Sequence, residues 1–271
     1  MQIHHDHVLE IIHDAASRHI LPLWQNLGQD QVMDKGGGDL VTAADRACEQ
    51  YLALHLQKLL DRSLVVGEEA VAADPTTLDA LHADRPVWVL DPLDGTRNFA
   101  HHREPFAVMV CLLLRGETIA SWIYDPLAQS LLSAELGAGT LLDGNRVTVE
   151  GATSPASELR GAVMTSYLPP GLRGYVEDRR ESFADWSGSG CAGHEYRRLV
   201  TGELDFVLYY RTLVWDHAPG VLIADEAGAF SRRYDGSQYT PTDSLKGLIC
   251  ANSEENWQRV REELLPKELP A

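Results

Sequence analysis

Cysteine is scarce in this chain of 271 residues, and its spacing does not suit the sites that cysteine usually builds. The four cysteines lie far apart and form no CxxC pair; they are Cys48, Cys111, Cys191 and Cys250. We therefore expect neither a structural zinc site nor a disulfide framework. The pattern is typical of small buried side chains in a reducing compartment.

Long apolar runs are missing as well. No stretch approaches the roughly 20 consecutive apolar residues that a transmembrane helix needs. The opening segment, MQIHHDHVLE, has no basic region followed by an apolar one, which is the pattern of a secretory signal. We therefore expect a cytoplasmic protein that has no membrane partner.

Positive charge is in short supply. Lys and Arg together number 23 and Asp and Glu number 40, which gives a net charge of −17. A protein with this net negative charge repels nucleic acids and anionic membranes, so we expect no direct contact with nucleic acid. It would also repel a phosphorylated metabolite unless cations lie among the acids. A cleft that binds cations would resolve this conflict.

The first part of the sequence predicts helices followed by an antiparallel sheet. Apolar periodicity predicts an amphipathic helix over 4–27, which Pro22 kinks or ends, and a second helix over 42–60. The glycine-rich segment KGGGDL separates these two helices. Short apolar runs then predict strands and a meander, at 64–66, 87–90, 106–114, 117–126 and 129–136, followed by a hairpin that turns at 143–145.

The pattern changes near residue 156. A strand at 162–167 leads to a helical stretch near 172–184, and a strand at 247–251 precedes a C-terminal helix. Alternation of strands and helices favours an α/β arrangement. We therefore expect an α+β half over 1–155 and an α/β half over 156–271, with a cleft between them.

Four acidic side chains lie where a predicted strand ends or a predicted helix begins. Glu68 follows the run LVVG, Asp91 follows VWVL, and Asp94 comes three residues later. Asp216 lies in WDHAPG, just before an apolar helix. Strand ends converge on clefts, so these carboxylates are expected to share one. Oxygen ligands without His or Cys favour Mg²⁺ or Mn²⁺.

The stretch WVLDPLDGTRNF joins such ligands to a candidate phosphate site. Asp91 and Asp94, on either side of a turn stiffened by proline, can face a common point, and the turn exposes the Leu93 carbonyl. Gly95 and Thr96 then open a helix, whose free N–H groups favour a phosphate oxygen. Carboxylates for metal beside N–H groups for phosphate indicate metal-assisted phosphoryl transfer.

With GEE upstream and WDHAPG downstream, DPLDGTRNF resembles the inositol monophosphatase family of magnesium-dependent, lithium-sensitive phosphatases. The resemblance covers nearly the whole chain and keeps the order of KGGGDLVTAAD, VVGEE, WVLDPLDGTRNF, GSGCAG and WDHAPGVLIADEAGA. It implies a sugar-phosphatase-like αβαβα sandwich with the active site between two halves, a dimer, and Mg²⁺-dependent hydrolysis of a small phosphate monoester.

The resemblance also implies metal-binding and catalytic roles. Two Mg²⁺ ions, with Mn²⁺ as a substitute, would be held by Glu68, Asp91, the Leu93 carbonyl, Asp94 and Asp216. Glu68 could also reach a third, weaker metal through waters, so the mechanism would use two or three ions. Thr96, hydrogen-bonded to Asp45, would orient the attacking water. From the residues alone, Asp45 could instead support only a helix N-terminus, because it lies three residues after Thr42.

Substrate contacts are implied for a second set of residues, namely Asp94, Gly95, Thr96, Ala192, Tyr209 and Arg211. Lys35, Glu69 and Arg97 would have secondary roles. Each of these three also has an alternative interpretation: an ordinary surface lysine, a solvated acid, and a structural ion pair, respectively.

The leaving-group side departs from the family pattern. Members that prefer inositol place a glutamate several residues before the WD motif, where this chain has Tyr209, followed by Tyr210 and Arg211. A tyrosine–arginine pair could bind a sugar, stack on a base or contact a second phosphate. The substrate therefore stays open among inositol phosphate, histidinol phosphate, 3′-phosphoadenosine 5′-phosphate and fructose 1,6-bisphosphate.

A different class of function also stays open. Some bacterial proteins of the resembled family act on the transcription machinery, apart from phosphatase activity. The acidic composition would allow a basic protein partner. A regulatory protein is therefore the alternative to an enzyme.

Overall fold

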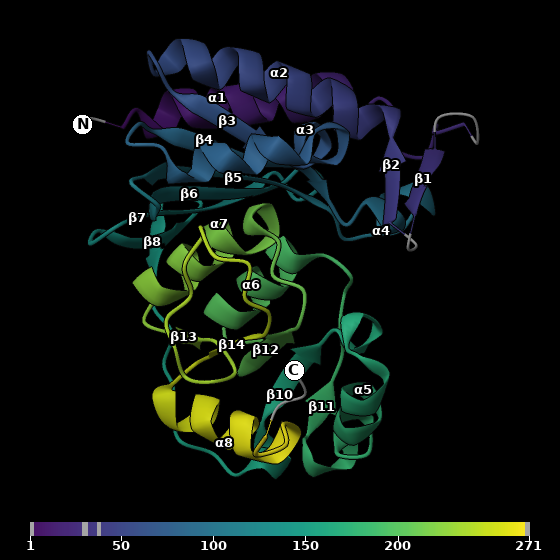
Figure 1. Cartoon of the computed structure of the whole chain (residues 1–271), viewed down its shortest axis with the longest axis vertical. Helices are drawn as coiled ribbons and strands as arrows, with labels where there is room; N and C mark the ends of the chain where they lie inside the picture. The colour runs from purple at the N-terminus through teal and green to yellow at the C-terminus, as the bar shows by residue number, and fades with distance from the viewer. Residues whose placement is uncertain (1–2, 29–31, 37–38, 269–271) are drawn as a thin grey trace.

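The computed structural model describes residues 3–28, 32–36 and 39–268, which form alternating layers of helices and sheets (Figure 1). The helical layers consist of α1 (His5–Ala15) with α2 (Ala43–Leu59), α6 (Ala192–Val200) with α7 (Val214–Glu226), and α5 (Pro170–Glu177) with α8 (Glu254–Leu264). One sheet lies between each pair of helical layers. The αβαβα sandwich expected from the sequence is confirmed.

The larger sheet contains seven strands in the order β3-β4-β5-β6-β7-β8-β9. Their bounds are β3 (Leu64–Gly67), β4 (Val87–Asp94), β5 (Ala107–Leu114), β6 (Glu117–Asp125), β7 (Ser130–Glu135), β8 (Gly139–Leu142) and β9 (Asn145–Val147). β3 runs parallel to β4, and every later neighbour is antiparallel. The predicted meander is therefore confirmed.

Strand β4 is longer than predicted. It continues from Val87 through Asp94, and its pairing with β5 is irregular between Asp91, opposite Met109, and Asp94, opposite Ala107. Pro92 lies in this irregular part, where the N–H that proline lacks is not needed for the ladder. The proline therefore produces a bulge within a buried strand instead of the predicted turn after it.

The N-terminal helix is shorter than predicted over 4–27. After α1 the chain makes one π-helical segment, Ala16–Ile20, and the helical hydrogen bonds stop near Pro22. The glycine-rich segment lies in a hairpin of β1 (Val32–Gly36) and β2 (Asp39–Thr42). Residues 37–38 of that segment lie outside the described residues.

The smaller sheet has the order β11-β10-β12-β14-β13. Its strands are β10 (Arg160–Val163), β11 (Asp185–Trp186), β12 (Phe206–Tyr209), β13 (Phe230–Arg232) and β14 (Leu248–Ala251). The strand predicted over 162–167 ends early, because a 3₁₀ turn follows it. β14 runs antiparallel to both of its neighbours, so the sheet is mixed. The proposed boundary after residue 155 stays a prediction.

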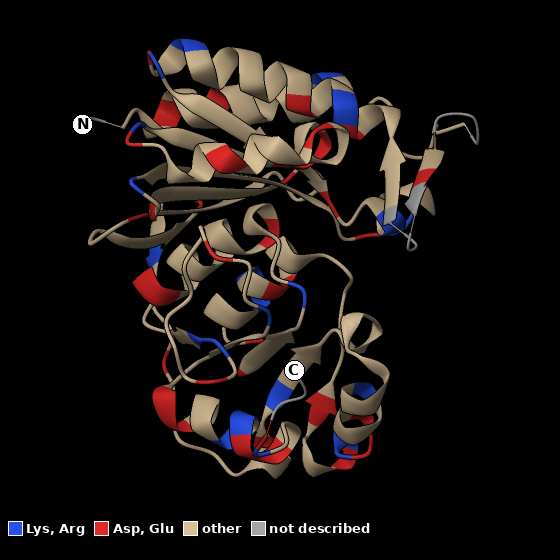
Figure 2. Cartoon of the chain, viewed as in Figure 1, with Lys and Arg blue, Asp and Glu red and all other residues tan. Residues whose placement is uncertain are grey.

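The remaining helices are short. They are α3 (Glu68–Ala73), α4 (Thr96–Ala100) and the 3₁₀ segments Pro75–His82, Ala156–Glu158, Thr165–Tyr167 and Arg180–Ser182. Acidic and basic residues both occur on the outer helices α5 and α8 (Figure 2). In the described part of the chain, no helix is both long and apolar enough to cross a membrane. All four cysteines are buried and unpaired, as predicted.

Helix α7 lies in the middle layer and is apolar on most of its surface, as expected for a helix buried between two sheets. It approaches α6 closely at Gly220, where a Cβ atom would overlap the ring of Tyr196. Tyr196 is itself fully buried. A glycine is therefore required at this helix contact for steric reasons.

The same substitution should have opposite effects at two helical glycines. We expect Gly220→Ala to lower the free energy of unfolding by about 1–3 kcal/mol, because the added methyl group overpacks the contact with Tyr196. In α5, a Cβ at Gly174 would meet nothing within 4 Å. There, Gly174→Ala should raise stability by about 0.5–1 kcal/mol. Urea unfolding of both variants tests this, and stabilisation by Gly220→Ala would contradict the packing described.

Candidate active site

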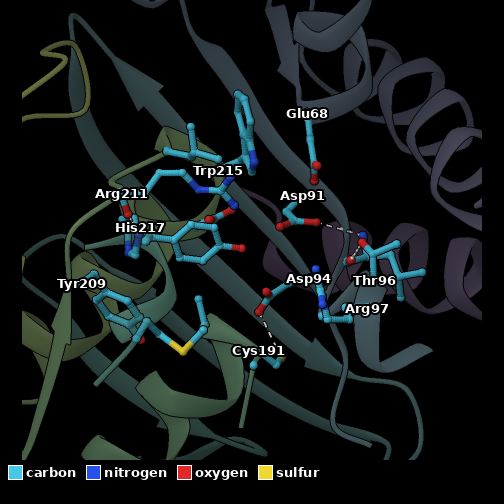
Figure 3. A pocket seen from close by; sticks show the side chains of 18 of the residues that line it. Glu68, Asp91, Asp94, Thr96, Arg97, Cys191, Tyr209, Arg211, Trp215 and His217 are labelled. Atoms are coloured by element: carbon cyan, nitrogen blue, oxygen red, sulfur yellow. Dashed lines mark hydrogen bonds between the residues drawn. The ribbon is translucent and has the colours of Figure 1, made fainter. Parts of the chain in front are cut away.

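A pocket of about 350 Å³ lies between the two sheets, lined by residues from both halves of the chain (Figure 3). Most of the residues predicted from the sequence line it: Glu68, Asp91, Leu93, Asp94, Gly95, Thr96, Arg97, Ala192, Tyr209, Arg211 and Asp216. The motifs are far apart in the sequence, but the fold brings them to one place.

Two predicted residues, Asp45 and Glu69, are not among the described residues that line the pocket. Asp45 is fully buried beneath it. Glu69 is partly buried, and its backbone N–H donates to Glu49. Lys35 lies in β1, but its side chain is outside the described part of the structure. Its predicted role is therefore not tested.

Asp91 lies within the buried strand β4 and is only 2% exposed. One of its carboxylate oxygens accepts the Leu93 N–H at 3.0 Å. Burial raises the pKa of Asp91 well above its ordinary value, and the nearby carboxylates of Glu68, Asp94 and Asp216 add to this shift. Figure 3 shows Glu68 and Asp91 pointing toward one another. Negative charge is therefore concentrated where a cation would relieve it.

Asp94 connects the two halves of the protein. Its Oδ2 accepts the Gly193 N–H at 2.6 Å and lies 3.0 Å from the Cys191 thiol, at the start of α6. Burial raises the pKa of Asp94, although the hydrogen bonds from Cys191, Gly193 and Ala192 oppose the shift. The GSGCAG motif therefore holds Asp94 in place as well as lining the pocket.

Both interpretations of Asp45 fit the structure. It completes a capping box with Thr42 at the start of α2, and its Oδ1 accepts the Thr96 hydroxyl at 3.1 Å. Thr96 also lies 2.8 Å from the Leu93 carbonyl oxygen, so its single proton has two possible acceptors. Burial raises the pKa of Asp45 to about 7, although hydrogen bonds from Thr42 oppose the shift. This carboxyl can therefore exchange a proton near neutral pH.

Asp216 lies in the first turn of α7, and the prediction that it precedes the helix is wrong. The helix begins at Val214, because Leu213 already has the extended conformation of an N-cap residue. Burial raises the pKa of Asp216 well above its ordinary value, helped by Asp94 and Glu68 and opposed by Arg211. A helix start still presents this carboxylate to the pocket, as the sequence suggested.

The predicted leaving-group side is built from aromatic rings and one arginine. Tyr209 ends β12, is 5% exposed and packs against His217 with ring centres 4.5 Å apart. Its buried hydroxyl has no hydrogen-bond partner within the described residues. The Arg211 guanidinium lies 4.1 Å from the ring centre of Tyr167. Tyr167 and Met164 also line this side, and neither was identified from the sequence.

His217 supports the Arg211 backbone. Its Nε2 lies 3.0 Å from the Arg211 carbonyl oxygen, which can only accept, so Nε2 carries the proton. Nδ1 must then accept the hydrogen bond from the Tyr196 hydroxyl, at 3.1 Å. Burial lowers the pKa of His217 to about 3, so this imidazole is neutral at physiological pH. These contacts give His217 a structural role beside the pocket.

The residues missed by sequence reasoning fall into two groups. Cys191 lies inside the recognised motif GSGCAG and Glu195 lies two residues after it, so proximity to Ala192 could have indicated both. Glu49 lies four residues after Asp45 on α2, and helical periodicity places the two on one face. Met164 and Tyr167 follow β10 in an irregular segment, and no sequence pattern placed them near the pocket.

The donor atoms around the pocket suit a hard divalent cation. They are carboxylate and carbonyl oxygens, from Glu68, Asp91, Leu93, Asp94 and Asp216. Within the described residues, no group of three or more His, Cys, Asp and Glu side chains is already arranged to hold a metal ion. Mg²⁺ commonly binds through one or two carboxylates and takes its other ligands from water and phosphate. The residues therefore fit such an ion.

Replacing His217 should change how stability depends on pH. The unfolded chain takes up the imidazole proton near the ordinary pKa of 6.5, whereas the folded protein does so only near 3. The contribution of neutral His217 to the free energy of unfolding is therefore present above pH 6.5 and is lost as the pH falls toward 3. Between pH 7 and pH 5 this loss amounts to about 2 kcal/mol.

We expect the difference in unfolding free energy between the wild type and His217→Gln to shrink by that amount over this pH range. Urea unfolding at each pH measures it. The variant His7→Gln, which changes an exposed histidine, is the control for removing a histidine. A difference that stays constant with pH would contradict the assignment.

Known proteins resemble this chain in sequence over most of its length. The model of the inositol monophosphatase family matches residues 4–268. The chain is 30% identical over 247 residues to the Nus factor SuhB of Vibrio cholerae, covering 88% of this chain and 87% of that protein. It is 33% identical over 235 residues to the inositol-1-monophosphatase of Mesorhizobium japonicum, covering 85% and 83%.

The fold agrees with these matches. The structure of a Thermotoga maritima IMPase superposes with a TM-score of 0.81 at 22% identity, covering 96% of this chain and 95% of that one. The match therefore leaves only a few per cent of either chain uncovered. Together with the family model, these relatives show that the chain belongs to the inositol monophosphatase family.

Proposed function

We propose that this protein hydrolyses a small phosphate monoester in a reaction that depends on Mg²⁺. The observation that carries this proposal is the meeting of Glu68, Asp91, Asp94 and Asp216 in one pocket, with the Asp45–Thr96 pair at its edge. The family to which the chain belongs is one of phosphomonoesterases. A scaffold without this activity would not need to keep four mutually repelling carboxylates together.

The metal ligands in this proposal are Glu68, Asp91, the Leu93 carbonyl, Asp94 and Asp216, with Mn²⁺ as a possible substitute for Mg²⁺. When bound, the ion would supply charge neutralisation for the phosphate and acidify a bound water. When the Thr96 hydroxyl donates to Asp45 and not to Leu93, the lone pairs of the Leu93 carbonyl oxygen remain for a cation. The bonds from Cys191 and Gly193 both go to Oδ2 of Asp94, and the proposal assigns Oδ1 to the cation.

Thr96 and Asp45 orient and deprotonate the attacking water. When the Thr96 hydroxyl donates its proton to Asp45, its oxygen can accept a hydrogen bond from a water molecule in the pocket. The Asp45 pKa of about 7 makes this carboxyl an effective proton acceptor near neutral pH. Gly95 has φ +85°, a conformation that suits glycine, and it opens the turn whose N–H groups would hold the phosphate.

The pocket favours a compact substrate that carries one phosphate. Its volume of about 350 Å³ lies near the lower end of the roughly 300–1,000 Å³ that ligand pockets span. Within the described part of the chain, the only arginine or lysine residues that line it are Arg97 and Arg211. A phosphorylated cyclitol, as in inositol phosphatases, fits these features better than 3′-phosphoadenosine 5′-phosphate or fructose 1,6-bisphosphate. Histidinol phosphate is the second choice. Lithium sensitivity and a homodimer are part of the same proposal.

A regulatory role is the second candidate. The observation that favours it is that a relative named as the Nus factor SuhB matches this chain as extensively as relatives named inositol-1-monophosphatase. In this alternative the partner is a protein of the transcription machinery. Phosphate release from the substrates named above, measured with and without a chelator, distinguishes the candidates. Release that requires Mg²⁺ favours the enzyme, and no release from any substrate favours the regulator.

Asp91→Asn should lower Mg²⁺-dependent phosphate release by at least about 100-fold, because Asp91 is proposed to be shared by both metal ions. The variant Asp235→Asn makes the same change in an exposed turn and should keep wild-type activity. Release from inositol 1-phosphate with added Mg²⁺ is the measurement. Near-normal turnover by Asp91→Asn would rule out the proposed metal site.

Thr96→Ala should slow hydrolysis by roughly 10²–10⁴-fold, because the attacking water loses its orienting hydroxyl. Metal binding should persist, since Thr96 contributes no metal ligand. The matched variant Thr96→Ser restores the hydroxyl and should recover most of the rate. The Mg²⁺-induced rise in Tm, measured for both variants, separates the two effects. Loss of that rise in Thr96→Ala alone would mean that Thr96 belongs to the metal site.

A further inference from the structure

Glu49 is a buried carboxylate that the reaction described above does not use. It lies on α2, one helical turn after Asp45, and is 7% exposed. Its two oxygens accept the backbone N–H groups of Glu69 and Ala70, at 2.7 and 2.8 Å. These are the second and third residues of α3, so Glu49 caps that helix from outside it.

The space beside α3 is shaped to admit this carboxylate. Gly67 precedes the helix with φ −110° and ψ 153°, a conformation that any residue can adopt. The backbone conformation at position 67 therefore does not require a glycine. A Cβ at Gly67 would instead overlap the carboxyl group of Glu49. The glycine and the glutamate, 18 residues apart in the sequence, are thus two parts of one contact.

The capped helix is the one that brings Glu68 to the pocket. α3 begins at Glu68 and has only six residues, too few to be stable without tertiary contacts. The first N–H groups of a helix have no partner inside it, and Glu49 supplies partners for two of them. Because Glu68 directly precedes both donors, the bonds to Glu49 fix the backbone from which the Glu68 side chain enters the pocket.

We propose that Glu49 is a positioning residue for the metal site: by holding α3 it sets the direction of the Glu68 carboxylate and thereby the affinity for Mg²⁺. This inference rests on the proposed function, in which Glu68 is a metal ligand. In this proposal, helix α2 supports the pocket at two places. Asp45 accepts a hydrogen bond from Thr96, and Glu49 holds the helix that carries Glu68.

The chain offers a matched control for this role. Glu226 makes the same kind of contact, accepting the N–H groups of Gly137 and Gly139, both at 2.7 Å. That contact lies at the turn between β7 and β8, and none of its residues lines the pocket. Glu49→Gln and Glu226→Gln each remove one acceptor from a pair of backbone donors. Only the first should alter metal binding.

The experiment measures the Mg²⁺ concentration that gives half of the metal-induced rise in Tm, without substrate, and then the Mg²⁺ dependence of phosphate release. In Glu49→Gln both concentrations should increase by about 10–100-fold, as expected when a group that orients a metal ligand is changed. The kcat at saturating Mg²⁺ should stay within about threefold of the wild type, because ions in excess restore occupancy of the site. Glu226→Gln should keep the wild-type Mg²⁺ dependence.

Gly67→Ala provides a second route to the same contact, because it displaces the Glu49 carboxyl while leaving the side chain intact. It should also raise the Mg²⁺ requirement, and it replaces Glu49→Gln if that variant does not fold. A wild-type Mg²⁺ requirement in whichever of the two variants folds, or an equal shift in Glu226→Gln, would overturn the inference. If the wild-type protein itself shows no Mg²⁺-induced rise in Tm and no phosphate release, the proposed function fails instead.

Discussion

The hydrogen bonds between Asp94 and the start of α6 are the interaction on which the pocket depends. A buried carboxylate is costly unless donors meet it, and Asp94 finds them in Gly193 and Cys191 on the other half of the protein. Gly193 must be small for α6 to come this close, since a Cβ there would lie 2.8 Å from a methyl group of Ile123. The hydrogen bonds to Asp94 thereby bring the two halves of the protein together around all the acidic residues of the pocket.

The remaining acids are held in an environment that favours a cation. Burial raises the pKa of Asp91 and Asp216, and each carboxylate adds to the shift of its neighbours. Their mutual repulsion is relieved by proton uptake or by a divalent ion. The aromatic side of the pocket offers only Arg211 as a counter-charge among the residues described. Metal binding and the stability of the pocket are therefore coupled in the proposed function.

The sequence predicted the acids well because local patterns place them. Glu68 follows an apolar strand, Asp91 follows the apolar run inside β4, and Asp216 lies in the first turn of an apolar helix, so topology brings them to one cleft. The bulge at Pro92 and the early start of α7 were missed, because both depend on pairing and capping that local patterns do not specify. The partners of Asp94 and Glu49 were missed for another reason. The bond between Cys191 and Asp94 joins residues 97 positions apart, and the bond between Glu69 and Glu49 joins residues 20 positions apart. Only the packing of the layers brings these residues together.

The separation of Asp94 from Gly193 has a consequence for protein synthesis. The donors of Asp94 lie 97 and 99 residues after it, so they leave the ribosome well after the sheet that carries Asp94 has been made. At about 5–20 residues per second, the emerging N-terminal half must wait several seconds or longer for α6. During that interval the incomplete chain lacks the contact that closes its pocket. Until α6 has been made, the nascent chain therefore lacks the hydrogen-bond donors that Asp94 has in the complete protein.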